Sequence, residues 1–412
     1  MPFRLKFLII PFLLMFMCAV CYDMTFTFMI QDYLISPPTP AKKQAAYPVW
    51  SPNGQYIAYV CYVDGPIETL FRRDMEWEND AGLTPKSWYT EEAADICRVD
   101  AQGNNFQRLT NQVGAEHDPT WSPDSSQIAY FSESGLYVMK ADGSDPKQLT
   151  PLEGEDLSWS PDGTKLLFAA RDLQSYDIYL VEPTTSHLSN VTATTSTEEI
   201  KPFWVWGSQQ ILFVAVDVQP LDYGQIDYRL PRYLKTKVLQ TGQEQSIHGG
   251  LYYNSVVASP QGQIYVVTDF ISTSPKQYDD NYRASGYYGT VYAMSLTNTT
   301  PISVVNLAVL PHDASTFSIS ADGQYLVYSK EDWADLAIQN LGTQQTEQLP
   351  LLKSAIETFG TYPERAVLSP DNRLLAIAVK LDLDSGFEGS DKERHILIID
   401  IQTGTTHQLV QP

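Results

Sequence analysis

A short turn motif recurs along the chain and constrains its fold more than any other feature. In its fullest copies a Trp precedes Ser-Pro-Asp-Gly or a close variant, and an apolar stretch stands on either side. Pro presets φ for the second turn position, Asp or Asn suits the third, and Gly or Asn accepts the left-handed conformation that returns the chain to the next strand. Each copy therefore predicts a tight β-hairpin between two buried strands. The seven copies begin at Trp50, Trp121, Trp159, Trp206, Ala258, Ile319 and Leu368, and the fourth is degenerate.

A second hairpin follows each of these turns. One example is the apolar run 136–139, the turn Asp142-Gly143-Ser144 and the run 147–150. Two hairpins supply four antiparallel strands, which is one propeller blade, so seven repeats predict an all-β, seven-bladed β-propeller of four-stranded antiparallel blades. The 12% aromatic content suits such sheets. We predict blades at approximately 47–110, 111–150, 151–192, 193–249, 250–307, 308–350 and 351–412.

The repeats resemble those of the TolB-like β-propeller family. The resemblance lies in Trp-Ser-Pro-Asp-Gly, in the strand 127–130, in Leu-Tyr-Val-Met-Lys-Ala-Asp-Gly at 136–143 and in Gln-Leu-Thr at 148–150. It covers roughly residues 47–410 and is weakest in the fourth blade. It implies a propeller in the cell envelope or outside the cell. It does not imply one activity, because relatives include protein-binding modules, propeller domains of serine peptidases and metal-dependent polysaccharide lyases. The N-terminal α/β domain of TolB itself has no counterpart here, so no role in the Tol–Pal system is carried over.

The first thirty residues have the pattern of a signal peptide or a transmembrane anchor. Arg4 and Lys6 precede an apolar run over 7–22, which resumes after Asp23 and continues to Ile30. Residues 7–30 are long enough to span a bilayer, and we favour an anchor over cleavage. In either case the positive-inside rule places the remaining chain outside the cytoplasm. We predict a linker at 31–46 and the propeller at 47–412.

The expected ends of the propeller leave the closure of its ring open. The first strand is expected to start at Tyr47 and the last to cover 407–410, which gives no obvious strand exchange between the first and last blades. Either residues 31–46 form a latch, or the two blades simply pack. The formal charge of −22 argues against a nucleic-acid partner, because phosphates would be repelled.

Insertions gather between the second and third strands of four blades. They cover approximately 62–94, 217–231, 271–289 and 380–394. Such loops share one face of a propeller, and long loops on a rigid scaffold often carry binding. The alternative is that this face merely tolerates insertions. Large aromatic and Arg side chains anchor interfaces, although they can equally pack the loops onto the scaffold. The candidate ligand-binding residues are Arg72, Arg73, Trp77, Trp88, Tyr278, Tyr282, Arg283, Tyr287 and Tyr288.

Two cysteines flank the first insertion. Cys61 is expected at the end of the second strand and Cys97 in the third, which are antiparallel neighbours. In an oxidising compartment they predict a disulfide that clamps the base of the loop; the alternative is two buried thiols.

Metal and catalytic signals are weak. Asp382, Asp384 and Glu388 alternate around a Gly bend in a way that can wrap Ca²⁺, but Gly386 is at the fifth position of the run rather than the sixth, and a solvated acidic loop is the competing interpretation. The sequence has no Gly-x-Ser-x-Gly and no His-Glu-x-x-His motif. We expect no cofactor beyond this calcium candidate.

These patterns favour a non-catalytic extracytoplasmic binding module. It would present its loop-rich face to a protein or glycan partner and be tethered to the membrane by its N-terminal segment. The alternative is a propeller-fold carbohydrate-active enzyme, a polysaccharide lyase or hydrolase, with its site at the mouth of the channel. A third hypothesis is a structural or sensory ectodomain.

Overall fold

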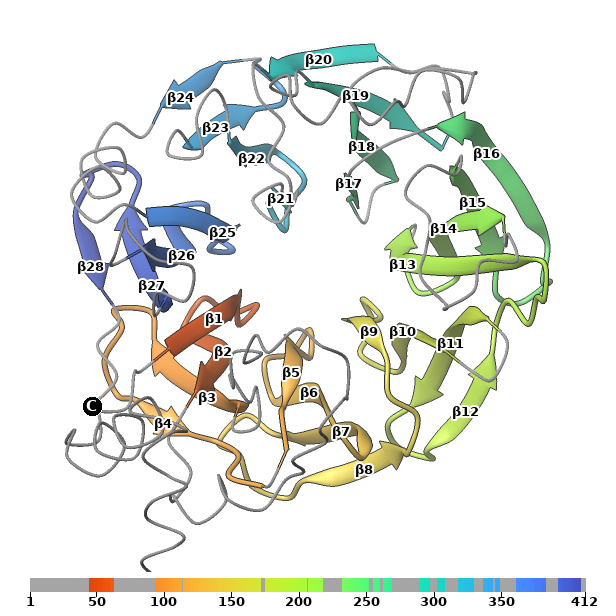
Figure 1. Ribbon diagram of the computed structural model, residues 1–412, viewed down its shortest axis with the longest axis horizontal. Coiled ribbons are helices and arrows are strands. Elements are labelled where there is room, and N and C mark those ends of the chain that lie inside the picture. The colour runs from red at the N-terminus through yellow and green to blue at the C-terminus, as the bar shows by residue number, and fades with distance from the viewer. Residues whose placement is uncertain are drawn as a thin grey trace, which may run out of the picture. The chain divides into compact units, whose positions relative to one another are not determined.

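A computed structural model shows a β-propeller. It describes residues 44–62, 94–112, 114–171, 175–205, 207–217, 232–251, 255–259, 262–268, 289–296, 302–307, 318–329, 336–343, 345–348, 361–382 and 392–408. In this part of the chain, seven four-stranded antiparallel sheets are each built from four consecutive strands. The sheets stand in a ring around a central channel, with the first strand of each sheet innermost and the fourth outermost (Figure 1). The predicted all-β, seven-bladed architecture is confirmed.

The strands of each blade follow the order of the chain. Blade one has β1 Gln44–Trp50, β2 Tyr56–Tyr62, β3 Ala94–Asp100 and β4 Gln107–Arg108. Blade two has β5 His117–Trp121, β6 Gln127–Ser132, β7 Gly135–Lys140 and β8 Lys147–Thr150. Blade three has β9 Glu155–Trp159, β10 Leu166–Arg171, β11 Tyr176–Glu182 and β12 His187–Asn190. Blade four has β13 Thr197–Val205, β14 Gln210–Asp217, β15 Arg232–Val238 and β16 Glu244–Leu251. Blade five has β17 Ser255–Ala258, β18 Gln263–Thr268, β19 Gly289–Ser295 and β20 Ile302–Leu307. Blade six has β21 Ser318–Ile319, β22 Tyr325–Ser329, β23 Leu336–Asn340 and β24 Thr346–Gln348. Blade seven has β25 Thr361–Leu368, β26 Leu374–Asp382, β27 Lys392–Asp400 and β28 Thr406–Gln408.

The recurring turn is held by its serine and its carboxylate. In blade two, Ser122 Oγ accepts the Gln127 N–H at 2.9 Å and donates to Asp124 Oδ1 at 2.6 Å. The Asp124 carboxylate also accepts the Ser126 N–H at 3.0 Å. The hydrogen bonds from Ser122 and then Ser126 hold the pKa of Asp124 below its usual value. The same Ser-to-carboxylate bond occurs at Ser160, Ser320 and Ser369, and Ser51 makes it to Asn53.

The fourth copy of the motif is shifted from its predicted place. In blades one to three the Trp pairs with the first buried apolar residue of the second strand, as Trp121 does with Ile128. In blade four the residue in this register is Trp204, which pairs with Ile211. The expected start at Trp206 is therefore wrong by two residues, because strand register rather than the turn letters decides which Trp is equivalent.

Neighbouring blades pack through apolar cores and through indole hydrogen bonds. One such core joins blades two and three and contains Phe131, Leu136 and Phe168. Across this junction Trp159 Nε1–H donates to the carbonyl of Thr120 at 3.3 Å. The same bond runs from Trp121 to Val49 and from Trp204 to Ser158, both at 3.3 Å. Each Trp thus ties its inner strand to the inner strand of the blade before it.

The ring closes without an exchanged strand. β1 begins at Gln44, three residues before the expected start at Tyr47, and pairs only within its own sheet. Blades seven and one share an apolar core that includes Ile57, Cys61 and Ile396. Trp50 Nε1–H donates to the carbonyl of Val367 at 3.1 Å, as the other three indoles do at their junctions. Blades seven and one therefore pack directly in the described part of the chain, while most of the latch segment expected at 31–46 lies outside the described residues.

The N-terminal segment stays a prediction. Residues 1–43 lie outside the described residues, and with them the expected signal or anchor and most of the linker. Chain contacts separate a unit at Met1–Lys42 from one at Lys43–Pro412. Across the residues that are described, none forms a helix with the length and hydropathy needed to cross a bilayer.

Candidate functional site

Four inner strands carry the same irregularity at the same position. β1, β5, β9 and β13 each shift register against their hairpin partner, which marks a β-bulge. In each bulge a residue other than Gly has a left-handed backbone and stands three residues before the Trp. Such a conformation costs about 1 kcal/mol or more and persists where the surrounding structure imposes it, often at functional sites. The residues and their φ angles are Tyr47 (54°), Asp118 (50°), Asp156 (57°) and Lys201 (50°).

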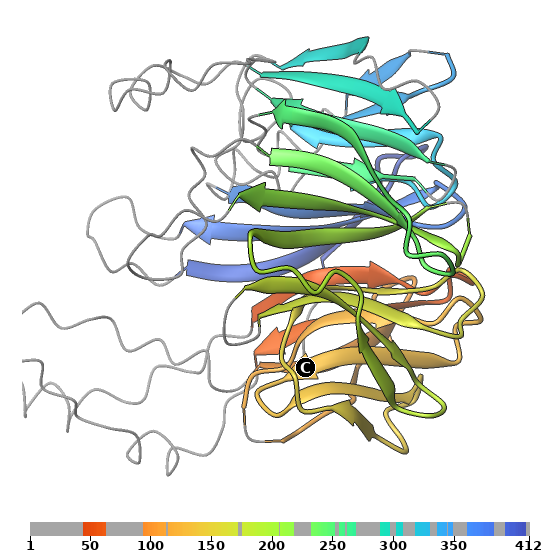
Figure 2. The same cartoon turned by 90° about the vertical axis from the view of Figure 1, so that its right-hand side faces the viewer.

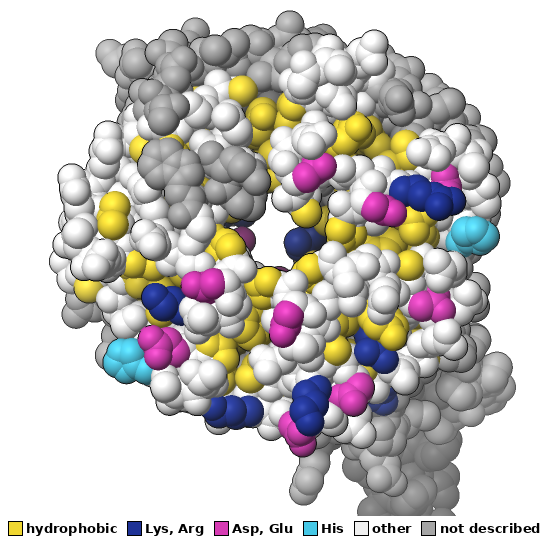
Figure 3. Space-filling view, turned by 180° about the vertical axis from the view of Figure 1, so that it is seen from behind, with side chains coloured by type: hydrophobic (Ala, Val, Ile, Leu, Met, Phe, Trp, Pro, Cys, Tyr) yellow, Lys and Arg dark blue, Asp and Glu magenta, His cyan; other side chains and the backbone are white. Residues whose placement is uncertain are grey.

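Charge contacts connect the charged members of this set across blades, and Tyr47 has the same register position on blade one. Asp118 on blade two is influenced by the charge of Arg365 on blade seven, although blade one separates these blades around the ring. Arg365 likewise stands three residues before Leu368, its blade's equivalent of the Trp. Lys201 Nζ lies 3.8 Å from Asp156 Oδ1 of the neighbouring blade. Viewed from behind, the channel is open, and charged side chains are visible at its wall (Figure 3). We call Tyr47, Asp118, Asp156, Lys201 and Arg365 the channel ring.

The channel ring separates its charges. Blades two and three contribute carboxylates, while blades four and seven contribute cations. Burial by itself would raise the pKa of Asp118, but the hydrogen bond and charge of His117, whose Nδ1 is 3.7 Å away, together with Arg365 hold it below its usual value. Tyr47 on blade one is the fifth member of the channel ring. It is 44% exposed, and no other large hydrophobic side chain among the described residues is classed as exposed.

The pKa of Glu155, the residue before Asp156, is shifted in the opposite direction to that of Asp118. Desolvation by the surrounding channel wall raises the pKa of Glu155, and repulsion from Asp156 adds to this effect. Lys201 opposes it only in part. The pKa values of Asp118 and Glu155 are therefore shifted in opposite directions, although the Glu155 side chain is exposed.

The predicted loop residues lie outside the described part of the chain. This holds for all nine aromatic and Arg candidates in 63–93 and 269–288 and for Asp384 and Glu388, so they stay predictions. Asp382 is the last residue of β26 and pairs with Lys392. Among the described residues no group of three or more His, Cys, Asp or Glu side chains is placed to hold a metal ion.

The strand ends that flank the insertions do show where the loops leave the propeller. Gln44 at the start of β1 pairs with Tyr62, which in turn pairs with Ala94. The start of an inner strand and the link between strands two and three therefore lie at one end of the blade, and the Ser-Pro turn lies at the other. The strands run between these two ends (Figure 2). The bulges accordingly stand toward the face from which the predicted loops emerge.

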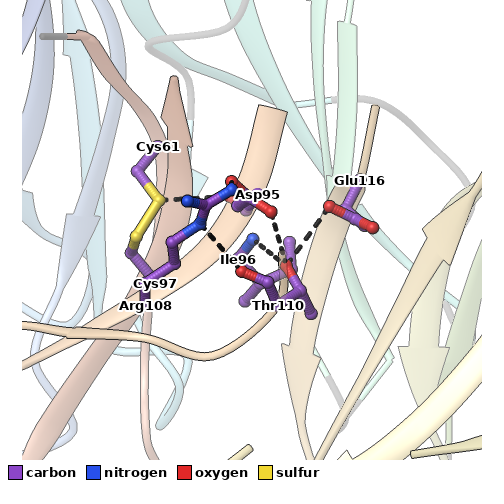
Figure 4. Close-up of a disulfide and its surroundings, with 7 residues drawn as sticks. All are labelled: Cys61, Asp95, Ile96, Cys97, Arg108, Thr110 and Glu116. Carbon is purple, nitrogen blue, oxygen red and sulfur yellow. Dashed lines mark hydrogen bonds and ion pairs between the residues drawn. A yellow bond between two sulfur atoms is a disulfide. The ribbon is translucent and has the colours of Figure 1, made fainter. Parts of the chain in front are cut away.

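The two cysteines form a disulfide. Cys61 on β2 and Cys97 on β3 have Cα atoms 5.8 Å apart, and both are fully buried. The bridge joins the strands at the base of segment 63–93 and lies beside Arg108 (Figure 4). It also belongs to the core between blades seven and one, a position that sequence reasoning did not assign.

A separate depression of about 560 Å³ lies on blade one at the turn end. Its charged groups make contacts within the chain, although the buried Nε of Arg98 has no hydrogen-bond partner among the described residues. Arg98 lies 4.3 Å over the ring of Tyr56 and donates to the Ala141 carbonyl at 2.6 Å, while Asp100 accepts backbone N–H groups of its own turn. These contacts stabilise the blade and leave the channel ring as the stronger candidate.

The sequence did not predict the channel ring because a Tyr, Asp or Lys side chain does not indicate that its residue has a left-handed backbone conformation. A signal was nonetheless present. Pro follows the bulge residue in three blades, at Pro48, Pro119 and Pro202. A Pro two residues before a recurring Trp could have indicated that the residue preceding the Pro belongs to the bulge.

Comparisons with known proteins agree on the class, a β-propeller. Residues 82–186 match the family described as dipeptidyl peptidase IV N-terminal region. A puromycin-hydrolyzing peptidase of Mycobacterium tuberculosis is 12% identical, with 91% of this chain and 55% of that chain covered and a TM-score of 0.59. The β-propeller domain of the Trilobed protease from Pyrococcus furiosus, described as having an open velcro topology, is also 12% identical, with 90% and 99% covered and a TM-score of 0.54. An oligogalacturonate lyase from Vibrio parahaemolyticus is 12% identical, with 77% and 82% covered and a TM-score of 0.52.

At these identities the similarity establishes the fold alone. The chain spans about half the length of the puromycin-hydrolyzing peptidase, so that enzyme's activity does not transfer. The match to the Pyrococcus domain covers nearly the whole of that domain and most of this chain.

Proposed function

We propose that the chain is a non-catalytic, extracytoplasmic binding module of the TolB-like propeller type, which presents its loop-side face to a protein or glycan partner. The observation that carries the proposal is the channel ring. Strained bulges in four blades aim one aromatic and three charged side chains at a common space, and Arg365 adds a further charge.

Of the two partner classes, a polypeptide fits the channel ring better. Carboxylates on one arc and cations on the other match a segment that carries both charges, and Tyr47 offers an apolar contact between them. Complementary charges of this kind select partners and set register. A neutral glycan would leave the cations and carboxylates without matched groups.

The test is partner capture from native envelope extracts with the full chain and two matched variants. The first replaces Asp118 and Asp156 by Asn and Lys201 and Arg365 by Met. The second replaces Glu133 by Gln, Asp145 by Asn, and Lys140 and Lys147 by Met, which gives the same charge change at exposed residues outside the channel ring. A partner retained by the wild type and the second variant but lost by the first supports the proposal. Equal retention by both variants contradicts it, and a retained partner that is a glycan would contradict the choice of a polypeptide.

A carbohydrate-active enzyme is the second candidate, and one observation favours it. The pKa values of Glu155 and Asp118 are shifted in opposite directions, and two carboxyl groups that differ in this way are a feature of glycoside cleavage, although the Glu155 side chain is exposed. Incubation with polysaccharides and measurement of new reducing ends tests this function. Release of reducing ends that Glu155→Gln abolishes would replace the binding-module proposal.

A further inference from the structure

Two pairs of buried carboxyl groups lie between neighbouring blades, outside the channel ring. In the first pair, Asp95 on β3 of blade one and Glu116, just before β5 of blade two, are each 1% exposed. In the second, Asp177 on β11 of blade three is 1% exposed and Glu199 on β13 of blade four is fully buried. Buried carboxylates are expensive unless they are paired or protonated, so both pairs require a physical account.

The first pair shares one hydroxyl group. Thr110 Oγ1 accepts the Ile96 N–H at 2.8 Å and lies 3.3 Å from Asp95 Oδ1 and 3.2 Å from Glu116 Oε2 (Figure 4). A hydroxyl has a single hydrogen, so it can donate to only one of the two carboxyl groups. The other contact is a hydrogen bond only when that carboxyl carries a proton of its own. Burial raises the pKa of Asp95 as well, but Arg108, whose Nη2 lies 2.6 Å from Asp95 Oδ2, opposes this rise, so of the two acids we assign the negative charge to Asp95.

The second pair repeats this arrangement without a cation. Thr192 Oγ1 accepts the Ile178 N–H at 2.9 Å and lies 3.1 Å from Asp177 Oδ1. An amide stands where Arg108 stands in the first pair, since Asn190 Nδ2 donates to Asp177 Oδ2 at 2.8 Å. Glu199 is bound by the hydroxyl groups of Thr194, 2.9 Å from both of its oxygens, and of Thr197. Two carboxyl groups without a cation need a proton even more than the first pair does.

The junction between blades two and three provides a natural control. Gly135 and Gly154 occupy the positions of Asp95 and Glu116 there. A Cβ at Gly135 would collide with the Thr150 carbonyl, and one at Gly154 with the Ala169 carbonyl. This junction therefore excludes both carboxyl side chains, although its inner strand β9 has the same bulge.

The surroundings of each pair favour the protonated acid. Burial raises the pKa of Glu116 to about 8, the charge of Asp95 adds to this, and Arg108 opposes it. Tyr130 from β6 faces the same group, and its own pKa is raised by burial and then by Glu116, so it stays neutral. Burial raises the pKa of Glu199 to about 7 against the hydrogen bonds from Thr197 and Thr194, and Asp177 adds to the rise.

Sequence position connects these protons to the channel ring. Glu116 stands two residues before Asp118 on the same strand path, and Glu199 stands two residues before Lys201. We propose that each junction holds one proton between its two carboxyl groups, and that loss of this proton to water displaces the inner strand and with it the channel residue that follows. The first junction then contains two carboxylates and one guanidinium, and the second contains two carboxylates alone. The effect on partner binding rests on the proposed function, whereas the proton and the strand displacement do not.

The proton is tested on the full chain labelled with ¹³C at Glu carboxyl carbons. We expect two resonances that titrate near pH 8 and pH 7, the first absent from Glu116→Gln and the second from Glu199→Gln. Gln keeps the shape and donating capacity of the protonated acid, so both variants are expected to fold. The matched control Glu198→Gln, at a partly exposed neighbour on the same strand, should retain both resonances. Glu116 and Glu199 signals that titrate near pH 4 to 5 would overturn the proposal.

The displacement is tested by amide hydrogen exchange at pH 6 and pH 9, corrected for the intrinsic rate. Exchange in 116–121 and 199–205 should rise at least tenfold at the higher pH, while 155–159 next to the glycine junction stays constant. In the Gln variants the corresponding rise should disappear. Exchange that rises equally in 155–159, or that persists in the variants, would refute the displacement. Failure to find any partner would defeat the proposed function and leave both of these results intact.

Discussion

The propeller has two kinds of blade junction, and they divide the ring. At the inner edge of blades one to four an indole donates to a carbonyl of the preceding blade, at 3.1–3.3 Å. Blades five, six and seven have Ala258, Ile319 and Leu368 at that position. The junction of blades six and seven uses the Ser318 hydroxyl instead, which donates to the Ala366 carbonyl at 2.6 Å. We call blades one to four the indole half and blades five to seven the aliphatic half.

The junction that closes the ring belongs to the indole half. Trp50 makes the same bond to blade seven that Trp121 makes to blade one, although no chain connection joins blades seven and one. Among the described residues, the closing contact is of the same kind as those inside the ring. It repeats a contact that three covalently continuous junctions already use, and the disulfide stiffens the blade that makes it.

Removal of the closing indole should have the largest effect. Trp50→Ala loses a large buried ring and a hydrogen bond, so it should lower the free energy of unfolding by about 4 kcal/mol. Leu368→Ala, the matched change in the aliphatic half, should cost about 3 kcal/mol. Trp50→Phe isolates the hydrogen bond at about 1 kcal/mol. Urea denaturation measures all three, and a smaller loss for Trp50→Ala than for Leu368→Ala would remove the distinction between the halves.

Loss of the disulfide should come next. The bridge spans 36 residues and lies in the core between blades seven and one. Replacement of Cys61 and Cys97 by Ala should lower the free energy of unfolding by about 3 kcal/mol, because the unfolded chain is no longer constrained. Amide exchange should rise first in β1 and β27. An even rise around the ring would show that the bridge does not act on closure.

The buried carboxyl pairs make the indole half sensitive to pH. A carboxyl whose pKa is raised in the folded state stabilises the fold below its unfolded pKa, and this stability is lost as the pH rises through the folded pKa. With the pKa of Glu116 at about 8 and that of Glu199 at about 7, the free energy of unfolding should fall by about 2 kcal/mol between pH 5 and pH 6 and should continue to fall up to pH 8. The double variant Glu116→Gln/Glu199→Gln should flatten this dependence. A curve that rises over the same range contradicts the assignment.

The turn serines should not distinguish the halves. Ser122 in the indole half and Ser369 in the aliphatic half make the same two hydrogen bonds. Ser122→Ala and Ser369→Ala should each cost about 1 kcal/mol. A difference of more than a factor of two in denaturant unfolding would mean that the halves differ in their turns as well as in their inner edges.

The sequence predicts the scaffold well because turn chemistry is local. Ser, Pro, Asp and Gly act through bonds that span five residues, as Ser122 does with Gln127, so seven copies specify seven hairpins. The prediction of Trp206 as the fourth motif Trp was wrong. Trp204 is the residue equivalent to the Trp of the other blades, and this follows from strand register, which is a nonlocal property.

The candidate site was less accessible from the sequence. Glu116 and Glu199 stand in polar stretches and look like ordinary surface acids, and only their partners on the preceding blade show that they are buried. The channel ring depends on backbone conformations that neighbouring blades impose. The loop residues proposed from the sequence, such as Trp77 and Tyr282, lie outside the described residues and remain hypotheses.

Because every described sheet is made from four strands that follow one another, each blade is one uninterrupted segment of the gene. Duplication or deletion of such a segment would add or remove a whole blade without leaving an unpaired strand elsewhere. In a propeller whose last blade borrows a strand from the other end of the chain, the same event would break a sheet. The four indoles mark the blades that share one sequence pattern, so a blade duplicated among them would bring the matching junction contact with it.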